Sequence, residues 1–307
     1  MLKKQGNEAI LNSTSLVMLI DRVIFRCVCG IGDRHLRTLK APDTIERRIN
    51  IPYGKHGKRN LLDVYYPKGT VKPLPAIVNM HGGGYVYGSK NHYQFYCMDL
   101  AQRGFTVINF NYRLVPKIAF PMPVIEANEV MKWVSANAAE YYIDTHNIFF
   151  VGDSAGAQIA SQYAAIVTNP AYAALFDLTV PDFTLKALGL NCGMYEKFHE
   201  IETPLPGIFH DYFGKDPSQH GEKMHVFTYI TGNYPPAFIT SAVNDFLLPC
   251  ARPMYEQLRE KGIHCELQIY GSKEEKKIGH VFHLNFFTET ARACNDAQCD
   301  FFRNSIT

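Results

Sequence analysis

The sequence predicts an α/β fold in which a mostly parallel sheet is flanked by helices. Three observations lead to this prediction. Short β-rich runs alternate with longer helical patterns beyond about residue 45, several of these runs are apolar throughout, and the 307-residue chain is 47% hydrophobic and 20% charged. Parallel strands covered on both faces read as continuous apolar runs, and strand–helix alternation is typical of a doubly wound sheet. The length suits a domain with a large core.

The predicted elements follow one another in the order that such a fold requires. Eight strands are expected where β-branched and aromatic residues gather, at residues 47–53, 61–67, 75–82, 105–113, 147–153, 185–192, 235–243 and 264–271. Helices are expected at residues 93–104, 124–142, 155–167, 251–262 and 288–304. Residues 46–307 are therefore predicted to form one domain around an eight-stranded sheet.

Two segments lie outside this alternation and are expected to form a cap. Residues 1–45 precede the first strand. Residues 193–231, rich in aromatic residues and histidine, form a long insertion after the sixth strand. A long loop in a compact domain is usually a lid or a binding segment.

The N-terminal segment contains a short apolar run, Leu16 to Ile20, followed by Asp21 and Arg22. The run is too short and too close to charges for a signal peptide or a transmembrane helix. An amphipathic helix that covers an apolar surface is expected instead. The residues expected on its apolar face are Ile20, Val23, Ile24, Cys27 and Val28.

Charge and cysteine usage exclude several classes of partner. The net charge is +2, which favours neither nucleic acid nor an anionic membrane as a partner. Eight cysteines are scattered along the chain without a CxxC pair, so no zinc site is expected. Reduced thiols in a cytoplasmic protein are the expected state. A homodimer stays open.

The most informative motif is the pentapeptide GDSAG, residues 152–156, which stands between an apolar strand and an Ala-rich helix. G-x-S-x-G in this context places a serine on a sharp, strained turn above the sheet, where flanking glycines avoid clashes. The N-terminus of the following helix directs N–H groups at developing negative charge. Ser154 is therefore the predicted nucleophile, and a structural Gly-rich turn is the alternative.

The sequence HGGG follows the third strand directly. Successive glycines cost backbone entropy, and close approach of a ligand to backbone amides is the expected benefit. The amides of Gly82 and Gly83, together with that of Ala155, are predicted to form an oxyanion hole. His81 is expected to support this loop, and Tyr85 is expected to contact substrate.

Together, HGGGY and GDSAG resemble the motifs of the hormone-sensitive-lipase-type esterases of the α/β-hydrolase fold. The segment NYRLVPKIAFPMPV, residues 111–124, is similar to the family's DYRLAPE…FPA block. The resemblance extends from about Asn60 to the C-terminus. Asn111 stands where the family usually has Asp, and Lys117 where it has Glu. These departures are expected to affect local hydrogen bonding and substrate preference, and not the reaction class.

A serine nucleophile needs a base, and the base needs an acid that holds its tautomer. In α/β-hydrolases these residues follow in the chain order Ser, Asp or Glu, His. Asp245 comes directly after the seventh predicted strand, and Asp245-Phe246-Leu247 resembles the family's D-x-L stretch. Asp153 and Asp182 are weaker candidates because they precede the nucleophile or the sixth strand.

Two histidines, His280 and His283, lie between the last predicted strand and the last helix. His280 follows Gly279, and His-Val-Phe at this point resembles the family's H-G-F. His283 lies nearer the helix start, where the positive end of the helix dipole lowers basicity. His280 is therefore the predicted base, and His283 is expected to pack or to cap.

The resemblance implies a serine esterase with the triad Ser154, Asp245 and His280, which cleaves small carboxylic esters of short or medium acyl chain through an acyl-enzyme. No metal or organic cofactor is expected. An amidase or formamidase using the same triad, and a non-catalytic small-molecule receptor of the same fold, stay open. The insertion carries four histidines whose spacing matches no metal-ligand pattern, so surface or cap positions are expected for them. They are His199, His210, His220 and His225.

Overall fold

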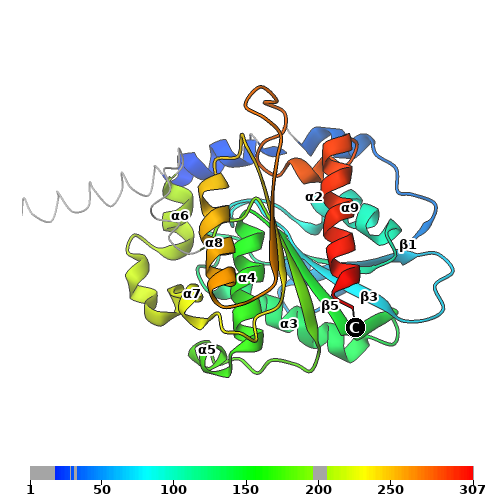
Figure 1. Ribbon diagram of the computed structural model, residues 1–307, viewed down its shortest axis with the longest axis horizontal. Coiled ribbons are helices and arrows are strands. Elements are labelled where there is room, and N and C mark those ends of the chain that lie inside the picture. The colour runs from blue at the N-terminus through cyan, green and yellow to red at the C-terminus, as the bar shows by residue number, and fades with distance from the viewer. Residues whose placement is uncertain (1–17, 28, 31–32, 196–205, 307) are drawn as a thin grey trace, which may run out of the picture.

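The computed structural model describes residues 18–27, 29–30, 33–195 and 206–306. Eight strands form one sheet in the order β1-β2-β4-β3-β5-β6-β7-β8. Strand β2 pairs antiparallel with β1 and β4, and all other neighbouring strands pair parallel. Each predicted strand overlaps one strand of this sheet, so the predicted α/β fold is confirmed (Figure 1).

The elements alternate along the chain, with several short helices added. The strands are β1 Ile45–Pro52, β2 Leu61–Pro67, β3 Leu74–Met80, β4 Thr106–Phe110, β5 Ile143–Asp153, β6 Leu185–Asn191, β7 Ala237–Ala242 and β8 Cys265–Tyr270. The α-helices are α2 Lys90–Gln102, α3 Met122–Asn137, α4 Ala155–Thr168, α5 Pro170–Leu175, α6 Pro206–Phe213, α7 Val226–Tyr229, α8 Leu248–Glu260 and α9 Glu289–Asn304. The 3-10 helices are η1 Asp33–Thr38, η2 Gly57–Asn60, η4 Pro217–Met224 and η5 Phe282–Leu284. Residues 18–27 are also helical and are called the N-terminal helix below.

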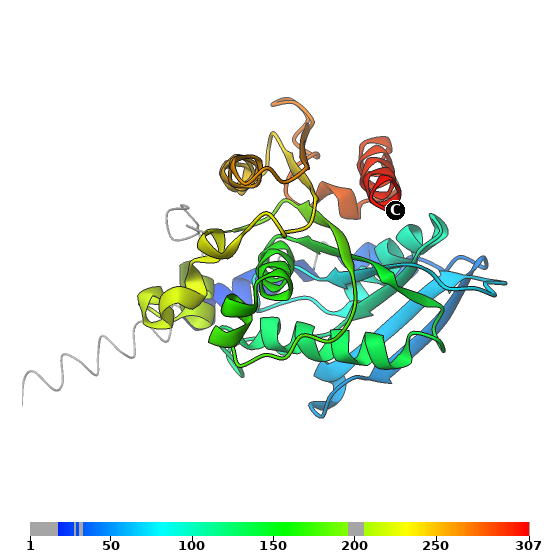
Figure 2. The ribbon, with the colours of Figure 1, turned by 60° about the horizontal axis from the view of Figure 1, so that its bottom comes forward.

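Helices cover both faces of the sheet (Figure 2). Helices α3, α4 and α8 contribute to the core on one face, and α2 and α9 to the core on the other. Successive residues of the central strands alternate between these two cores. Val78 and Phe150 belong to the first, whereas Ile77 and Phe149 belong to the second. Burial on both faces explains why these strands are apolar throughout.

The N-terminal helix exposes the face that was predicted to be buried. Ile20, Val23 and Ile24 are 46%, 52% and 45% exposed, so the prediction that they cover an apolar surface is wrong. The buried contact is polar, because Asp21 is 7% exposed and its Oδ2 accepts a hydrogen bond from the Gly207 amide at 2.8 Å. Helical periodicity distinguishes the two faces of a helix, but packing decides which one is covered.

An ion pair also ties the N-terminal helix to the insertion after β6. Arg22 Nη1 lies 2.9 Å from Asp211 Oδ2 of α6. Of the other residues predicted on the apolar face, Cys27 is exposed and Val28 lies outside the described residues. Phe25 is half-buried and lines the pocket described below. The helix is therefore held by polar contacts and by one inward-pointing aromatic ring.

The insertion contains helices where the sequence predicted a loop. It contains α6, η4 and α7. Helix α5 was also not predicted. These helices are short, and proline stands at the first position of α5, α6 and η4, so they lack the long apolar periodicity on which prediction depends. None of the helices in the described ranges is long and apolar enough to span a bilayer.

Candidate active site

Ser154 lies on the turn between β5 and α4. Its φ of 52° and ψ of −119° are costly for a residue with a Cβ atom. A Cβ on Gly152 would lie 2.3 Å from the carbonyl oxygen of Gly156, and a Cβ on Gly156 would lie 1.9 Å from that of Met80. Because neither clash could be relieved without moving backbone, the turn requires glycine on both sides of the serine.

His280 and Asp245 complete a chain of hydrogen bonds that begins at Ser154. His280 Nε2 lies 3.1 Å from Ser154 Oγ, and His280 Nδ1 lies 2.8 Å from Asp245 Oδ1. The three residues follow β5, β7 and β8, whose carboxyl ends meet at one edge of the sheet because these strands run parallel. The arrangement allows the imidazole to take the serine proton while the carboxylate faces its other nitrogen.

The Asp245 carboxylate is stabilised by several donors. Its Oδ1 also accepts from the Leu247 amide at 2.9 Å, and its Oδ2 accepts from the Ser241 hydroxyl at 3.0 Å. Burial is the largest single influence on the pKa of Asp245 and raises it. The hydrogen bond and charge of His280 lower the pKa, as do hydrogen bonds from the Leu247 amide and the Cys192 thiol. Together these effects outweigh burial, so the pKa of Asp245 lies below its usual value. Ser241 and Cys192 belong to no motif, so sequence reasoning missed them.

His283 lies close to His280 in the chain but is buried away from the nucleophile. It is 1% exposed, and its ring packs edge-on against Tyr96 with centroids 5.4 Å apart. Within the described part of the chain, neither ring nitrogen has a hydrogen-bond partner. Burial, followed by the charge of His280, lowers the pKa of His283 to about 3. The structure therefore brings His280, and not His283, against Ser154.

The amide of Gly82 is already engaged, which corrects its assignment to the oxyanion hole. It donates to Tyr93 Oη at 2.9 Å and to Asp153 Oδ1 at 3.2 Å. The Tyr93 hydroxyl in turn donates to Asp153 Oδ2 at 2.8 Å. One N–H shared between two acceptors has no hydrogen left for a substrate oxygen. The sequence could not reveal this, because Tyr93 reaches the loop from α2.

The carboxyl group of Asp153 is buried directly beneath this loop. It is 2% exposed, and burial raises its pKa to about 6, against the opposing effects of the Tyr93 hydroxyl, His280 and the Gly82 amide. At neutral pH it is therefore ionised, and a charged acceptor strengthens both hydrogen bonds that it receives. Asp153, set aside as a triad acid, thus anchors the HGGG loop.

Three other amides near Ser154 remain available. Within the described ranges, no acceptor is found for the N–H groups of Gly83, Gly84 and Ala155. Ala155 is the first residue of α4, where amides lack an acceptor inside the helix. Gly83 and Gly84 have φ of 110° and 56°, which residues with a Cβ adopt only at a cost. These three amides are the candidates for an oxyanion hole.

Tyr85 does not occupy a substrate-contacting position, so this prediction is corrected. Its side chain is fully buried, its ring stacks on Tyr212 with centroids 3.6 Å apart, and its hydroxyl donates to Gln158 Oε1 at 2.9 Å. The residue directs its ring into the core beneath the insertion. Sequence could place Tyr85 after the glycines, but the direction of its side chain depends on the turn that follows them.

A pocket of about 390 Å³ opens at Ser154 and His280. Its volume lies in the range of sites that bind small molecules. The lining comes from the HGGG loop, the N-terminal segment, α2 and the chain between β8 and α9. It includes Phe25, Cys29, Leu36, Tyr87, Tyr96, Lys277, Phe282, Leu284 and Phe286. Aromatic and aliphatic side chains dominate, so the pocket suits a largely apolar ligand.

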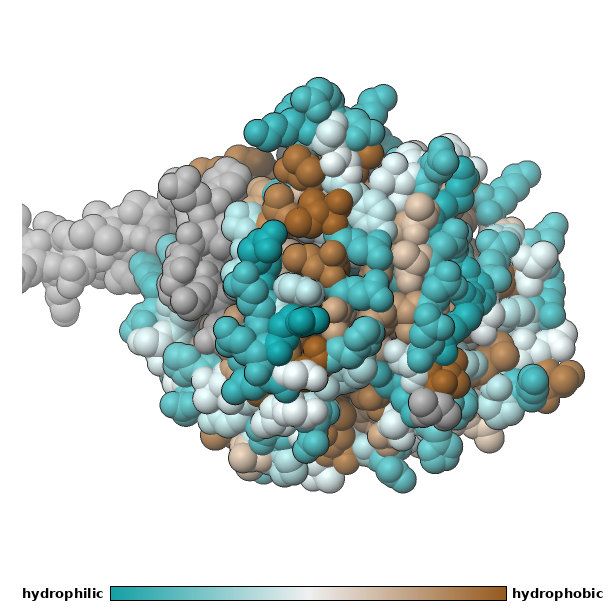
Figure 3. All heavy atoms as spheres, in the orientation of Figure 1, coloured by the Kyte–Doolittle hydropathy of each residue, from teal (hydrophilic) through white to brown (hydrophobic). Residues whose placement is uncertain are grey.

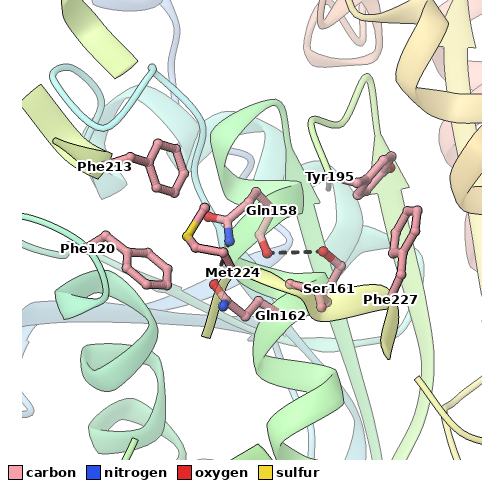
Figure 4. Close-up of a pocket in the computed structure, with 9 residues that line it drawn as sticks. Phe120, Gln158, Ser161, Gln162, Tyr195, Phe213, Met224 and Phe227 are labelled. Atoms are coloured by element: carbon pink, nitrogen blue, oxygen red, sulfur yellow. Dashed lines mark hydrogen bonds between the residues drawn. The ribbon is translucent and has the colours of Figure 1, made fainter. Parts of the chain in front are cut away.

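A second cavity lies between α4 and the insertion (Figure 4). Gln158, Ser161 and Gln162 form its polar wall, and Phe120 and Phe213 lie opposite. Its volume of about 10 Å³ has room for about one water molecule. Ser154 is not part of its lining. The larger pocket is therefore the one that can hold a substrate of the nucleophile.

The departure at Asn111 changes local hydrogen bonding, as expected. Its Oδ1 accepts from the Lys90 amide at the start of α2, and its Nδ2 donates to the Lys58 carbonyl, both at 2.7 Å. An ionised aspartate could make only the first of these bonds. Lys117 is exposed. Asn111 thus joins the start of α2 to the segment before β2, away from Ser154.

The described histidines of the insertion do not gather into a metal site. Among the residues that the structure describes, one group of three potential ligands lies within 4.8 Å, and it consists of Cys192, Asp245 and His280. His220 Nε2 instead donates to a backbone carbonyl at 2.8 Å, and its ring contacts Phe120. His199 lies outside the described residues.

Comparison with known proteins finds several esterases that are similar to this chain. The BD-FAE family model matches residues 62–191. The chain is 29% identical over 225 residues to versiconal hemiacetal acetate esterase of Dothistroma septosporum, covering 65% of each protein. It is 29% identical over 279 residues to carboxylesterase NlhH of Mycobacterium tuberculosis, covering 82% of this chain and 84% of that protein. The chain spans from 51% to 65% of the length of versiconal hemiacetal acetate esterase and three other curated relatives.

Solved structures show the same architecture. Esterase B of Lactobacillus rhamnosis superposes with a TM-score of 0.86 at 20% identity, over 94% of this chain and 95% of that chain. At this identity the likeness establishes the fold. The family-model match spans the HGGG and GDSAG loops, and the relatives extend the sequence similarity beyond them. The chain therefore has the α/β-hydrolase fold and is similar in sequence to esterases of this fold.

Proposed function

We propose that this protein is a serine esterase that hydrolyses small carboxylic esters. The observation that carries the proposal is the hydrogen-bonded chain Ser154–His280–Asp245, which opens on a pocket of about 390 Å³. The named activities of the relatives, versiconal hemiacetal acetate esterase and carboxylesterase, agree with this reaction. The pocket volume is consistent with a short or medium acyl chain.

In the proposed reaction His280 Nε2 takes the proton from Ser154 as Oγ attacks the ester carbonyl carbon. Asp245 holds the Nδ1 proton and stabilises the imidazolium. The carbonyl oxygen becomes an oxyanion, which the amides of Gly83, Gly84 and Ala155 stabilise. His280 then protonates the leaving alcohol. A water molecule, activated by the same imidazole, hydrolyses the acyl-enzyme and restores Ser154.

The N-terminal segment and the insertion are proposed to cap the catalytic domain of residues 46–307. Phe25 and Leu36 line the pocket from the N-terminal side. Arg22 and Asp21 join that side to α6 of the insertion. These contacts support caps formed by residues 1–45 and 193–231. A cytoplasmic location and a homodimer stay predictions.

The proposal is tested with p-nitrophenyl esters from acetate to decanoate, assayed with wild type and four variants. Ser154→Ala and His280→Ala are expected to lose activity by at least about 10³-fold, because the triad residues act as a unit. His283→Ala is expected to keep the pH profile of the wild type. Asp153→Asn should remain active because an amide oxygen still accepts from Gly82. An inactive His283 variant beside an active His280 variant would reverse the assignment of the base.

The same preparation separates the alternatives. An amidase would also hydrolyse p-nitroacetanilide, which an esterase leaves intact. A receptor would bind esters without turnover, and a fluorophosphonate probe would fail to label Ser154. Labelling of the wild type and not of Ser154→Ala, together with ester turnover, supports the esterase.

A further inference from the structure

Three positively charged side chains line the pocket at Ser154 or bind the backbone of the segment that follows the HGGG loop. Lys277 lines it from the loop between β8 and η5, and Gly88 lines it from the end of the HGGG loop. Arg59 Nη1 donates to the Gly88 carbonyl at 3.2 Å. Arg26 Nε donates to the Val86 carbonyl at 2.9 Å. The guanidinium groups of Arg26 and Arg59 therefore bind the backbone of residues 86–88, and the Lys277 side chain lines the pocket itself.

The segments that carry these charges lie along one edge of the molecule. In Figure 1 the blue N-terminal helix and the orange loop after β8 both run along the top, at the carboxyl edge of the parallel strands. Figure 3 shows hydrophilic atoms gathered at the same place over the orange loop. These segments thus lie at the edge of the sheet where the strands that lead to Ser154, Asp245 and His280 end.

These three cations lack carboxylate partners within the described part of the chain. Other arginines of the protein have them: Arg22 pairs with Asp211 at 2.9 Å, and Arg113 pairs with Glu126 at 2.6 Å. No described carboxylate lies within ion-pair distance of Arg26, Arg59 or Lys277. The two arginines donate to backbone carbonyls, and no described acceptor is found for the Lys277 ammonium group. Within the described ranges, these three cations are therefore not neutralised by ion pairs.

Among the described residues, one carboxylate lines the pocket, and it forms no ion pair with the three cations. Asp153 lines the pocket, but both of its oxygens accept hydrogen bonds beneath the HGGG loop, from the Gly82 amide and the Tyr93 hydroxyl. The two guanidinium groups also act on each other. Burial lowers the pKa of Arg59, and the positive charge of Arg26 lowers it further. Like charges without a counter-charge destabilise each other, and an anion placed between them removes that cost.

We propose that the ester substrate carries an anionic group, a carboxylate, which Arg26, Arg59 and Lys277 hold at the pocket mouth while the ester reaches Ser154. The inference rests on the proposed esterase function and names its substrate class. A guanidinium group matches a carboxylate in shape and donates two parallel hydrogen bonds to it. The apolar lining between mouth and nucleophile accepts the chain that joins carboxylate and ester.

Matched ester pairs test the proposal. Monoethyl adipate and ethyl hexanoate differ by a carboxylate on the acyl side, and 5-acetoxypentanoate and pentyl acetate differ by one on the alcohol side. In at least one pair we expect kcat/KM to be about tenfold higher for the anionic ester at low salt. The preference should shrink in about 0.5 M NaCl, because exposed charges are screened.

Substitution of the cations assigns the effect. Arg59→Met and Lys277→Met are each expected to reduce the preference, which is the ratio of kcat/KM for the anionic ester to kcat/KM for the neutral ester, by about two- to tenfold. Lys276→Met is the matched control, because its ammonium group lies 3.3 Å from Asn244 Oδ1 and the residue does not line the pocket. It should keep the full preference.

The outcomes separate this proposal from the proposed function. Equal or faster hydrolysis of the neutral ester in both pairs overturns the anionic substrate and leaves ester hydrolysis standing. A preference that survives both substitutions, or that Lys276→Met abolishes equally, also overturns it. Failure to hydrolyse any of the four esters would refute the anionic substrate and the esterase together.

Discussion

Replacing Asp153 by asparagine tests whether the carboxylate before the nucleophile is held at a cost to stability. Its pKa rises from 3.8 to about 6 on folding, with burial as the main cause. At about 1.4 kcal/mol for each pKa unit, this corresponds to about 3 kcal/mol. The folded state binds the proton more tightly than the unfolded state. The stability that the protonated group contributes is therefore complete below pH 3.8 and is lost as the pH rises through about 6.

Asparagine has nearly the same shape and does not titrate, so the difference between the two proteins isolates Asp153. Between about pH 4.5 and about pH 7.5 the wild type is expected to lose about 2 kcal/mol of unfolding free energy relative to Asp153→Asn. The rest of the full difference of about 3 kcal/mol is lost below pH 4.5. Urea unfolding followed by circular dichroism at several pH values measures this difference. A difference in unfolding free energy between wild type and Asp153→Asn that stays constant over this pH interval would refute the reasoning. It would mean that burial does not raise the pKa of Asp153.

Three further substitutions probe the site. Gly156→Ala should abolish folding, because its Cβ would lie 1.9 Å from a carbonyl oxygen of β3. The control Gly232→Ala, whose Cβ would have no atom within 4 Å, should change the unfolding free energy by less than about 0.5 kcal/mol. A soluble, active Gly156→Ala variant would contradict the tight contact between this turn and β3. Tyr85→Phe should cost about 1–2 kcal/mol in urea unfolding, because the buried Gln158 amide loses a donor. A large rise in KM would restore Tyr85 as a substrate contact. Asp245→Asn should lower kcat on the order of 10⁴-fold without loss of fold, because the amide holds the wrong imidazole tautomer; a fall of less than about tenfold would place the acid elsewhere.

Local signals in the sequence were sufficient for the sheet and for the turn at Ser154. Two-sided apolar runs mark strands that are covered on both faces, and this property belongs to each strand by itself. A Cβ at Gly152 would meet backbone of the same strand–turn–helix, whereas a Cβ at Gly156 would meet backbone at the end of β3. Chain order then directed attention to Asp245 and His280, which the structure brings into hydrogen-bond contact with each other and with Ser154.

The predictions that needed correction concern the directions of single groups. Gly82 and Tyr85 stand in the expected loop, but the Gly82 amide is taken by Asp153 and Tyr93, and the Tyr85 ring turns into the core. Periodicity also found the apolar face of the N-terminal helix, although Asp21 lies on the buried side. Each of these outcomes depends on a partner from a distant segment.

By itself, the sequence determined which elements form and where a nucleophile, an acid and a base enter the chain, because backbone sterics and side-chain periodicity act over a few neighbouring residues. Only the tertiary structure decided which amides stay free for an oxyanion, which histidine faces Ser154, and which charges remain unpaired at the pocket mouth. Those properties depend on burial and on contacts between residues far apart in the chain. His280 and His283 are three positions apart, yet packing leaves one half-exposed beside the nucleophile and buries the other in the core.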